Sequence, residues 1–304
     1  MGVNYRWRAL SESDLPAVTA LSAEALAADG GSPFAAAGWL MSRWYADGVA
    51  ASFAVFSSGE LAGVCARRAV AEPGGPMRIA GQVRPAFRGR GLGARLLDSA
   101  LAGVRADQPV VVETESLTAA ADELFRSRSL RQVFAEDVMA MPLPGAAAAQ
   151  AASGGLTLVP WTRELAPRFY QVWYEAFADR PGFPGWPAST WIEWISDDPD
   201  FRAEWTLLAR AGRRDVGFVA GAAGGWIVQT GVIPQARGQR VCAAMLTEVF
   251  RRMRAAGETR TVLNVNVNNP AAITAYQRLG YARTGRRARY ERPLAPAEVA
   301  ADEE

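Results

Sequence analysis

The chain has 304 residues, of which 50% are hydrophobic and 21% are charged, a composition that fits two globular domains of about 150 residues each. Its formal net charge of +2 excludes a strong attraction to nucleic acid or membranes from bulk charge alone. Histidine is absent, which excludes a histidine general base, a Ser-His-Asp triad and a histidine-based metal site.

The cysteines, the N-terminal sequence and the absence of lysine add further expectations. Cys65 and Cys242 form no CxxC pair, so we expect reduced, buried thiols and no metal site. The N-terminus has no long apolar segment and no stretch reaches the length of a membrane span, which together favour a cytoplasmic protein. Lysine is absent, so every basic side chain is an arginine, a residue well suited to phosphate recognition.

The first 142 residues are predicted to form one domain with the element order β-α-α-β-β-β-α-β-α-β. Ser11 or Ser13 caps the first helix, and the sequence SSGE joins two strands as a hairpin. The predicted strands cover residues 5–10, 52–57, 61–70, 77–83, 110–114 and 132–141, and the predicted helices cover 11–28, 34–46, 91–106 and 118–128.

A linker rich in Pro, Gly, Ala and Ser at 143–155 separates this domain from a second one at 156–293. The same element order recurs there, which indicates internal duplication. Residues 294–304 are predicted as a loose acidic tail. The second set of strands covers 156–161, 206–210, 217–222, 226–233, 261–267 and 283–292, and its helices cover 164–178, 187–196, 240–256 and 270–279.

The most specific local signal is the run from Val83 to Gly93, VRPAFRGRGLG, between a predicted strand and a predicted helix. Glycines in such a loop let backbone amides approach an anion, and the helix N-terminus adds the positive end of its dipole. Two arginines can add charge-assisted contacts. The sequence therefore predicts a pyrophosphate cradle formed by Val83, Arg88, Gly89, Arg90, Gly91, Leu92, Gly93 and Ala94.

This loop resembles the acyl-CoA signature of the GNAT acetyltransferase family, Q/R-x-x-G-x-G/A, in the run Arg88-x-x-Gly91-x-Gly93. The resemblance extends to both halves of the chain. It implies two tandem GNAT folds, each a mixed α/β fold with a mostly antiparallel sheet and splayed strands flanked by helices. It also implies acetyl-CoA or another acyl-CoA as cosubstrate. The architecture resembles the mycothiol synthase-like tandem acetyltransferases, which act on bacterial metabolites.

The second copy of the loop departs from the family pattern. Arg237 and Gly238 match, but Arg240 stands at the first glycine position and Cys242 at the second small position. Phosphates pass close to the backbone there, so the departure makes ordinary CoA binding in the second domain doubtful. Arg240 itself contacting a phosphate is one alternative, and a different ligand is another.

The second domain carries a helix that begins at Asn269-Pro270 and ends at Gly280, as capping rules expect. The segment resembles the family's N-x-x-A-x-x-x-Y-x-x-x-G-F/Y pattern. The resemblance implies that Tyr276 protonates the departing CoA thiolate, which its phenol pKa near 10 permits. Without the resemblance, a core aromatic residue is the preferred interpretation of Tyr276.

The matching segment of the first domain has Thr118 where Asn is expected and Phe125 where Tyr is expected. Phe125 has no proton to give. The first domain therefore has the better cofactor loop and the second has the acid. This complementary loss predicts that the first domain holds acyl-CoA and that the second performs the transfer.

The family resemblance implies direct attack of a neutral amine, with the oxyanion held by a backbone N–H near Val83 or Val232. It also implies strands that splay at a bulge to form the cofactor slot. Asp179, Glu193 and Glu204 are base candidates, although each also fits a solvated surface charge.

Three residues are candidates for contact with the acceptor. Asn264 and Asn266 share one strand face and can hydrogen-bond an acceptor or form ordinary polar lining. Trp186 lies in the non-helical run 181–187 within an aromatic segment, 169–205, which indicates either core packing or an aromatic acceptor wall.

Three functions remain open at this point. The first is acyl transfer from acyl-CoA to the primary amine of a small metabolite, by a monomer or homodimer. The second uses aminoacyl-tRNA as donor, for which the arginine-rich strand 283–289 would contact phosphates, although a charged edge strand is the simpler interpretation. The third is a non-catalytic acyl-CoA-binding protein.

Overall fold

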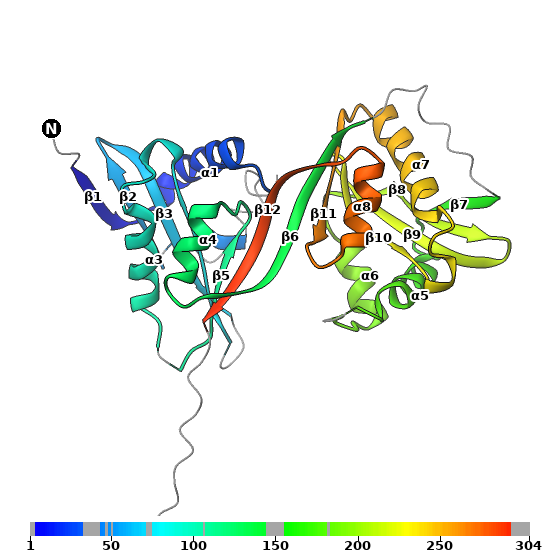
Figure 1. The fold of residues 1–304 in the computed structure, drawn as a ribbon, viewed down its shortest axis with the longest axis horizontal. Helices are drawn as coiled ribbons and strands as arrows, with labels where there is room; N and C mark the ends of the chain where they lie inside the picture. The colour runs from blue at the N-terminus through cyan, green and yellow to red at the C-terminus, as the bar shows by residue number, and fades with distance from the viewer. Residues whose placement is uncertain are drawn as a thin grey trace, which may run out of the picture. The chain divides into compact units, whose positions relative to one another are not determined.

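The computed structural model describes residues 4–32, 43–45, 48–49, 51–70, 75–105, 107–143, 155–180 and 183–292. The chain packs into two compact units that are discontinuous in sequence (Figure 1). Unit 1 consists of Met1–Val138, Val265–Asn269 and Arg283–Glu304, and unit 2 consists of Met139–Asn264 and Pro270–Ala282.

The sheet of unit 1 is mostly antiparallel. Its strands pair side by side in the order β1, β2, β3, β4, β5, β12 and β6. β4 and β5 pair in parallel, whereas the pairs β1–β2, β2–β3, β3–β4 and β12–β5 are antiparallel. The strands are β1 (Tyr5–Ala9), β2 (Ser52–Ser57), β3 (Glu60–Ala69), β4 (Met77–Val83), β5 (Val110–Thr114), β6 (Arg131–Pro142) and β12 (Ala282–Arg292).

Helices cover both faces of this sheet because alternate strand residues point to opposite sides. Helix α1 (Leu15–Asp29) packs Val18 and Leu21 onto one face, where they form a core with Ala54 and Val64. Helices α3 (Leu92–Ala102) and α4 (Ala119–Arg126) bury Leu96, Leu97 and Phe125 on the other face. The predicted helix 34–46 lies outside the described residues except for 43–45, which are helical.

Unit 2 repeats this architecture with strands in the order β11, β10, β9, β8 and β7. As in unit 1, one pair, β10–β11, is parallel. The elements are β7 (Leu156–Pro160), α5 (Ala166–Phe177), α6 (Ala188–Ser196), β8 (Phe201–Ala211), β9 (Arg214–Ala222), β10 (Trp226–Val232), α7 (Val241–Ala255), β11 (Arg260–Asn266) and α8 (Pro270–Arg278). The mixed α/β fold predicted from the sequence is confirmed.

The last strand, β12, belongs to unit 1, although the sequence placed residues 283–292 with the second domain. Figure 1 shows it (orange-red) running beside β5, and Ala288 to Arg292 pair with Thr114 to Val110. Tyr290 is fully buried in the unit 1 core, and its ring centroid lies 4.8 Å from that of Phe125. The apolar face of β12 therefore completes a core formed by residues near the start of the chain.

The two parallel strand pairs separate soon after they begin, and in unit 1 a slot lies between β4 and β5 where they part. β4 pairs with β5 only at Met77, Arg78 and Ile79, while it stays paired with β3 as far as Val83. β10 pairs with β11 only at Trp226 and Ile227. The predicted bulge is present in β10, where the register with β9 shifts between Ile227 and Gln229, but the β3–β4 register has no shift.

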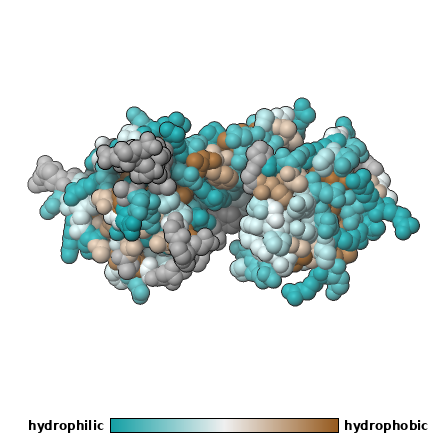
Figure 2. All heavy atoms as spheres, turned by 90° about the horizontal axis from the view of Figure 1, so that it is seen from below, coloured by the Kyte–Doolittle hydropathy of each residue, from teal (hydrophilic) through white to brown (hydrophobic). Residues whose placement is uncertain are grey.

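The surface is mainly polar. Figure 2 shows a mostly hydrophilic (teal) face interrupted by small hydrophobic areas. The large apolar side chains that are exposed in the described part of the chain are Val133, Tyr174, Trp194 and Val228. No helix among the described residues is long and apolar enough to cross a membrane.

Candidate active site

The first glycine-rich loop joins β4 to α3 and keeps two glycines in the left-handed conformation. Gly89 has φ of 71° and Gly91 has φ of 76°. The first intrahelical hydrogen bond runs from Arg95 N to Gly91 O at 3.1 Å, so the amides of Leu92, Gly93 and Ala94 have no partner within the helix. These three N–H groups and the positive end of the helix dipole are the kind of arrangement that binds anions.

A cavity of about 300 Å³ extends from this loop into the slot between β4 and β5. Its lining includes every predicted residue of the first loop except Arg90: Val83, Arg88, Gly89, Gly91, Leu92, Gly93 and Ala94. A Cβ added at Gly89 or Gly91 would meet no atom within 4 Å, so the space over the loop is open to a ligand. The volume lies at the lower end of the range typical of ligand pockets. These residues fit an acyl-CoA molecule with its pyrophosphate on the loop and its acyl arm in the slot.

Arg88 is not a free phosphate ligand, because its guanidinium holds the loop to the end of α1. It donates to both carboxylate oxygens of Asp29 at 2.6 and 2.7 Å, and its Nε donates to Val83 O at 3.1 Å. Arg90 is exposed and makes longer contacts, at 3.3 Å to the Tyr5 hydroxyl and 3.2 Å to Ala86 O. Arg90 is thus the arginine of this loop that remains available to an anion.

The second loop keeps the backbone of the first despite its different residues. Gly238 has φ of 75°, and Arg240, which replaces the first glycine of the motif, has φ of 62° and precedes α7. As in the first loop, the first hydrogen bond within the helix, here α7, runs from Ala244 N to Arg240 O at 3.0 Å. The amides of residues 241–243 are therefore presented like those of residues 92–94.

Arg237 repeats the contacts of Arg88. Its terminal nitrogens donate to Asp179 at 2.8 and 3.2 Å, and its Nε donates to Val232 O at 3.3 Å. The hydrogen bonds from Arg237 lower the pKa of Asp179. A paired carboxylate with a lowered pKa is a poor proton acceptor, so Asp179 does not fit the role of general base. Glu193 and Glu204 are both exposed.

Tyr276 is buried on α8 in unit 2, with its ring centroid 5.8 Å from that of Tyr281. Among the described residues its hydroxyl has no hydrogen-bond partner, whereas the Tyr281 hydroxyl lies 3.0 Å from Thr261 Oγ1. Burial raises the pKa of Tyr276, and the nearby Arg180 guanidinium lowers it by less. The phenol thus keeps its proton and has it available for a ligand.

Asn269 lies at the start of α8, where its backbone N–H donates to Asn266 O at 2.9 Å. Val232 ends β10 on the separated part of that strand. In unit 1 the corresponding helix begins at Thr118, whose hydroxyl accepts from Ala121 N at 3.1 Å. Phe125 occupies the tyrosine position there and lines the 300 Å³ cavity.

The three residues predicted to contact the acceptor, Asn264, Asn266 and Trp186, differ in their hydrogen bonds and packing. The Asn264 side-chain oxygen is buried with no hydrogen-bond partner, which leaves it open to a ligand donor. Asn266 instead accepts from Asn268 N at 2.9 Å and stabilises a local turn. Trp186 lies over Trp173, with ring centroids 6.5 Å apart, and its carbonyl accepts from the Tyr170 hydroxyl at 3.0 Å.

Aromatic packing brings helix α5 close to strand β10 in unit 2. A Cβ at Gly231 of β10 would lie 2.8 Å from a ring carbon of Phe177. Phe177 in turn stacks on Trp173 and carries the Arg180 guanidinium 4.0 Å above its ring. Sequence reasoning missed Arg180 and Asp29, although an Asp at the end of the first long helix in both copies was a usable signal.

The arginines of β12 are occupied by ion pairs, which removes support from a tRNA contact there. Arg286 binds Asp137 at 2.7 Å, and Arg287 lies 3.4 Å from Glu115. No cluster of metal-ligating side chains is present in the parts of the chain that the structure describes.

Comparison with known proteins identifies relatives of this arrangement. Residues 160–281 match the acetyltransferase (GNAT) family. The chain is 30% identical to mycothiol acetyltransferase of Thermobispora bispora, over 89% of this chain and 93% of the relative. A GCN5-related N-acetyltransferase from Sphaerobacter thermophilus superposes with a TM-score of 0.72 at 25% identity, covering 96% of each chain. A tandem GNAT protein from the clavulanic acid biosynthesis pathway shares the fold at 15% identity, with a TM-score of 0.62 over 97% of this chain and all of that one.

Proposed function

The chain belongs to the GNAT acetyltransferase family as a tandem protein, and from this premise we propose that it transfers an acetyl or other acyl group from acyl-CoA to the primary amine of a small molecule. The first domain holds acyl-CoA, and the second performs the transfer. The observation that carries the proposal is the pairing of an open cofactor slot in unit 1 with a buried, protonated tyrosine in unit 2.

The cofactor assignment is supported by the cavity over the first loop. Backbone amides at the start of α3 would hold the pyrophosphate, and the separated strands β4 and β5 would hold the pantetheine arm. Phe125 lines that slot at the position where the family pattern has a tyrosine, and it offers only an apolar surface. Acyl-CoA bound in unit 1 would therefore be held without a group that can protonate its thiolate.

The transfer assignment is supported by the groups around Tyr276. In the proposed step, which uses a separate acyl-CoA molecule bound in unit 2, the amine nitrogen bonds to the acyl carbon as the C–S bond breaks, and Tyr276 gives its proton to the departing thiolate. The amine loses a proton to water. The backbone N–H of Val232 stabilises the negative charge that develops on the carbonyl oxygen. The first acceptors to test are mycothiol-related amines, because the curated relative is named a mycothiol acetyltransferase.

One pair of variants tests the division between the domains. Native mass spectrometry of the full chain with acetyl-CoA should show a tightly held CoA that is lost in Gly91→Glu, because the added carboxylate repels the pyrophosphate. Tyr276→Phe should keep that CoA and lose most turnover. Retention of CoA in Gly91→Glu, or full turnover in Tyr276→Phe, would overturn the corresponding half of the proposal.

A further inference from the structure

An arginine without an ionic partner lies beside the groups proposed for transfer in unit 2. Arg180 follows helix α5, and its guanidinium carbon lies 4.0 Å from the centroid of the Phe177 ring. No hydrogen bond or ion pair holds this guanidinium within the described part of the chain. Because the ring covers one face of the planar group, the N–H edges remain free to donate to a ligand.

The neighbouring carboxylate does not neutralise Arg180. Asp179 accepts hydrogen bonds from two terminal nitrogens of Arg237, at 2.8 and 3.2 Å. Two guanidinium groups therefore share one carboxylate. Desolvation lowers the pKa of Arg180, and the Arg237 charge adds a smaller contribution in the same direction. An arginine stays protonated in spite of such shifts, so an anionic ligand is what would balance this group.

Arg180 lies next to both of the groups that the proposed transfer places around the acyl group. Phe177, which carries the guanidinium, packs against β10 at Gly231, where an added Cβ would lie 2.8 Å from a ring carbon. The next residue, Val232, supplies the N–H proposed for the carbonyl oxygen. On the other side, Arg180 interacts electrostatically with Tyr276, the proposed proton donor to the sulfur. A cation that flanks both positions is close to the acyl chain.

The corresponding position in unit 1 is a glycine. Gly30 follows Asp29 as Arg180 follows Asp179, and each aspartate pairs with the arginine of its own loop. Gly30 has φ of 67°, and a Cβ there would clash with the backbone carbonyl oxygen of Thr284. The arginine is therefore specific to the unit that is proposed to perform the transfer.

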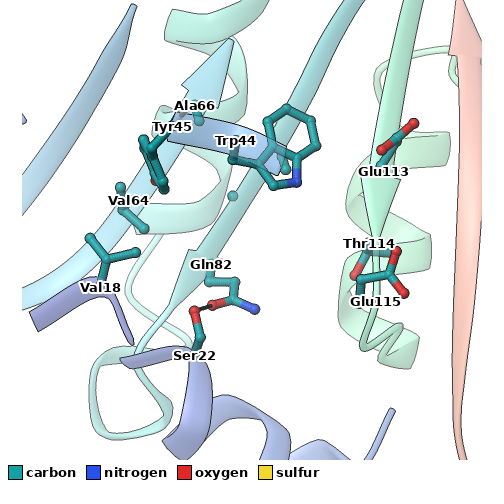
Figure 3. A pocket seen from close by; sticks show the side chains of 12 residues that line it. Val18, Ser22, Trp44, Tyr45, Val64, Ala66, Gln82, Glu113, Thr114 and Glu115 are labelled. Atoms are coloured by element: carbon teal, nitrogen blue, oxygen red, sulfur yellow. Dashed lines mark hydrogen bonds between the residues drawn. The ribbon is translucent and has the colours of Figure 1, made fainter. Parts of the chain in front are cut away.

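Acidic side chains on the α1 side of the unit 1 sheet are already paired with arginines. Figure 3 shows Glu113 and Glu115 of β5 there. Glu113 accepts from Arg43 at 2.5 Å and from Arg78, and Arg287 lies 3.4 Å from Glu115. The arginine that follows α5 has no such partner among the described side chains of unit 2.

We propose that Arg180 binds a carboxylate at the far end of the acyl group, so that the donor for the transfer is the CoA thioester of a short dicarboxylic acid. This inference rests on the proposed function, because it requires transfer in unit 2. The guanidinium can donate two parallel hydrogen bonds to a carboxylate. The phosphates of CoA are a poorer match, because they would lie at the N-terminus of α7, whereas Arg180 lies beside the tyrosine that protonates the sulfur.

The test compares succinyl-CoA with butyryl-CoA, whose acyl chain has the same length and ends in a methyl group instead of a carboxylate. Both are titrated calorimetrically into the full chain carrying Gly91→Glu, which removes the binding proposed for unit 1, and no acceptor is needed. We expect succinyl-CoA to bind about tenfold or more tightly than butyryl-CoA, because hydrogen bonds to a charged group are strong. Binding of neither would overturn the inference together with transfer in unit 2, whereas equal binding would overturn the inference alone.

Two further substitutions in the same protein locate the carboxylate. Arg180→Gln should weaken succinyl-CoA binding about tenfold or more and leave butyryl-CoA binding unchanged. Arg213→Gln, which replaces an exposed arginine in the turn between β8 and β9, is the matched control and should change neither affinity. Unchanged succinyl-CoA binding in Arg180→Gln would overturn the proposal. Equal losses for both donors in Arg180→Gln would also overturn it, because they would place Arg180 on the CoA moiety.

Discussion

Arg240 holds in the second loop the left-handed backbone conformation that Gly91 holds in the first, with φ values of 62° and 76°. Glycine adopts this conformation without steric penalty, whereas a residue with a Cβ is destabilised there by about 1–2 kcal/mol. The side chain of Arg240 is exposed at the N-terminus of α7, where the phosphates of an acyl-CoA molecule used for transfer in unit 2 would lie.

Arg240→Gly should therefore separate stability from binding. We expect the variant to gain about 1 kcal/mol in the free energy of unfolding, because glycine removes the strain. We also expect a higher KM for acetyl-CoA, because a phosphate contact is lost. Urea denaturation and steady-state kinetics measure the two effects. An unchanged KM would exclude Arg240 from cofactor binding and leave the strain unexplained by this function.

The two Arg–Asp ion pairs, Arg88–Asp29 and Arg237–Asp179, should contribute unequally to cofactor binding. Asp29 is 10% exposed beside Arg88, whereas Asp179 is 52% exposed beside Arg237, and solvent screening weakens exposed pairs. Asp29→Asn should weaken CoA retention by unit 1 about tenfold, and Asp179→Asn should raise the KM for acetyl-CoA by about threefold or less. Calorimetric titration and kinetics on the same two proteins provide the comparison. A larger effect at Asp179 would contradict this ranking.

Local sequence patterns predicted most helices and strands of this fold, because each of these elements depends mainly on residues close to it in the sequence. Strand β4 matches the prediction at both ends, since the Pro and Gly residues after Val83 end it. The position of β12 could not be predicted, because its apolar residues Ala288 and Tyr290 fit either core equally well. The glycine-rich loop was visible as a motif, but the use of Arg88 as a clamp depends on Asp29, far away in the sequence.

Gly231 is expected to be irreplaceable for packing in unit 2. A Cβ there would lie 2.8 Å from a ring carbon of Phe177 and 2.9 Å from atoms of Ala176 and Phe218, all in a packed interior. Gly231→Ala should reduce the free energy of unfolding by about 1–3 kcal/mol. In Gly93→Ala the new carbon would make only ordinary contacts at 3.6 Å, so stability should change by less than about 1 kcal/mol. Equal losses in the two variants would refute the steric argument.

Tyr276→Phe should lower kcat by a factor on the order of 100, because the departing thiolate would lose its proton donor. Tyr281→Phe is the matched control on the neighbouring ring. It removes the hydroxyl that lies 3.0 Å from Thr261, so it should reduce stability by about 1 kcal/mol and leave kcat near the wild-type value. Steady-state assays of released thiol distinguish the two. Similar kcat losses in both would indicate a packing role for Tyr276.

The pH dependence of kcat/KM should show only a rising limb up to about pH 10. Burial raises the pKa of Tyr276 above its ordinary value of 10.0, so the group stays protonated as pH increases and acts as acid throughout this range. The rise comes from the amine, which attacks only when it has lost its proton. Asp179 contributes no limb near neutrality, because its lowered pKa keeps it ionised. A falling limb below pH 10 that disappears in Tyr276→Phe would show that the tyrosine loses its proton earlier than its buried position implies.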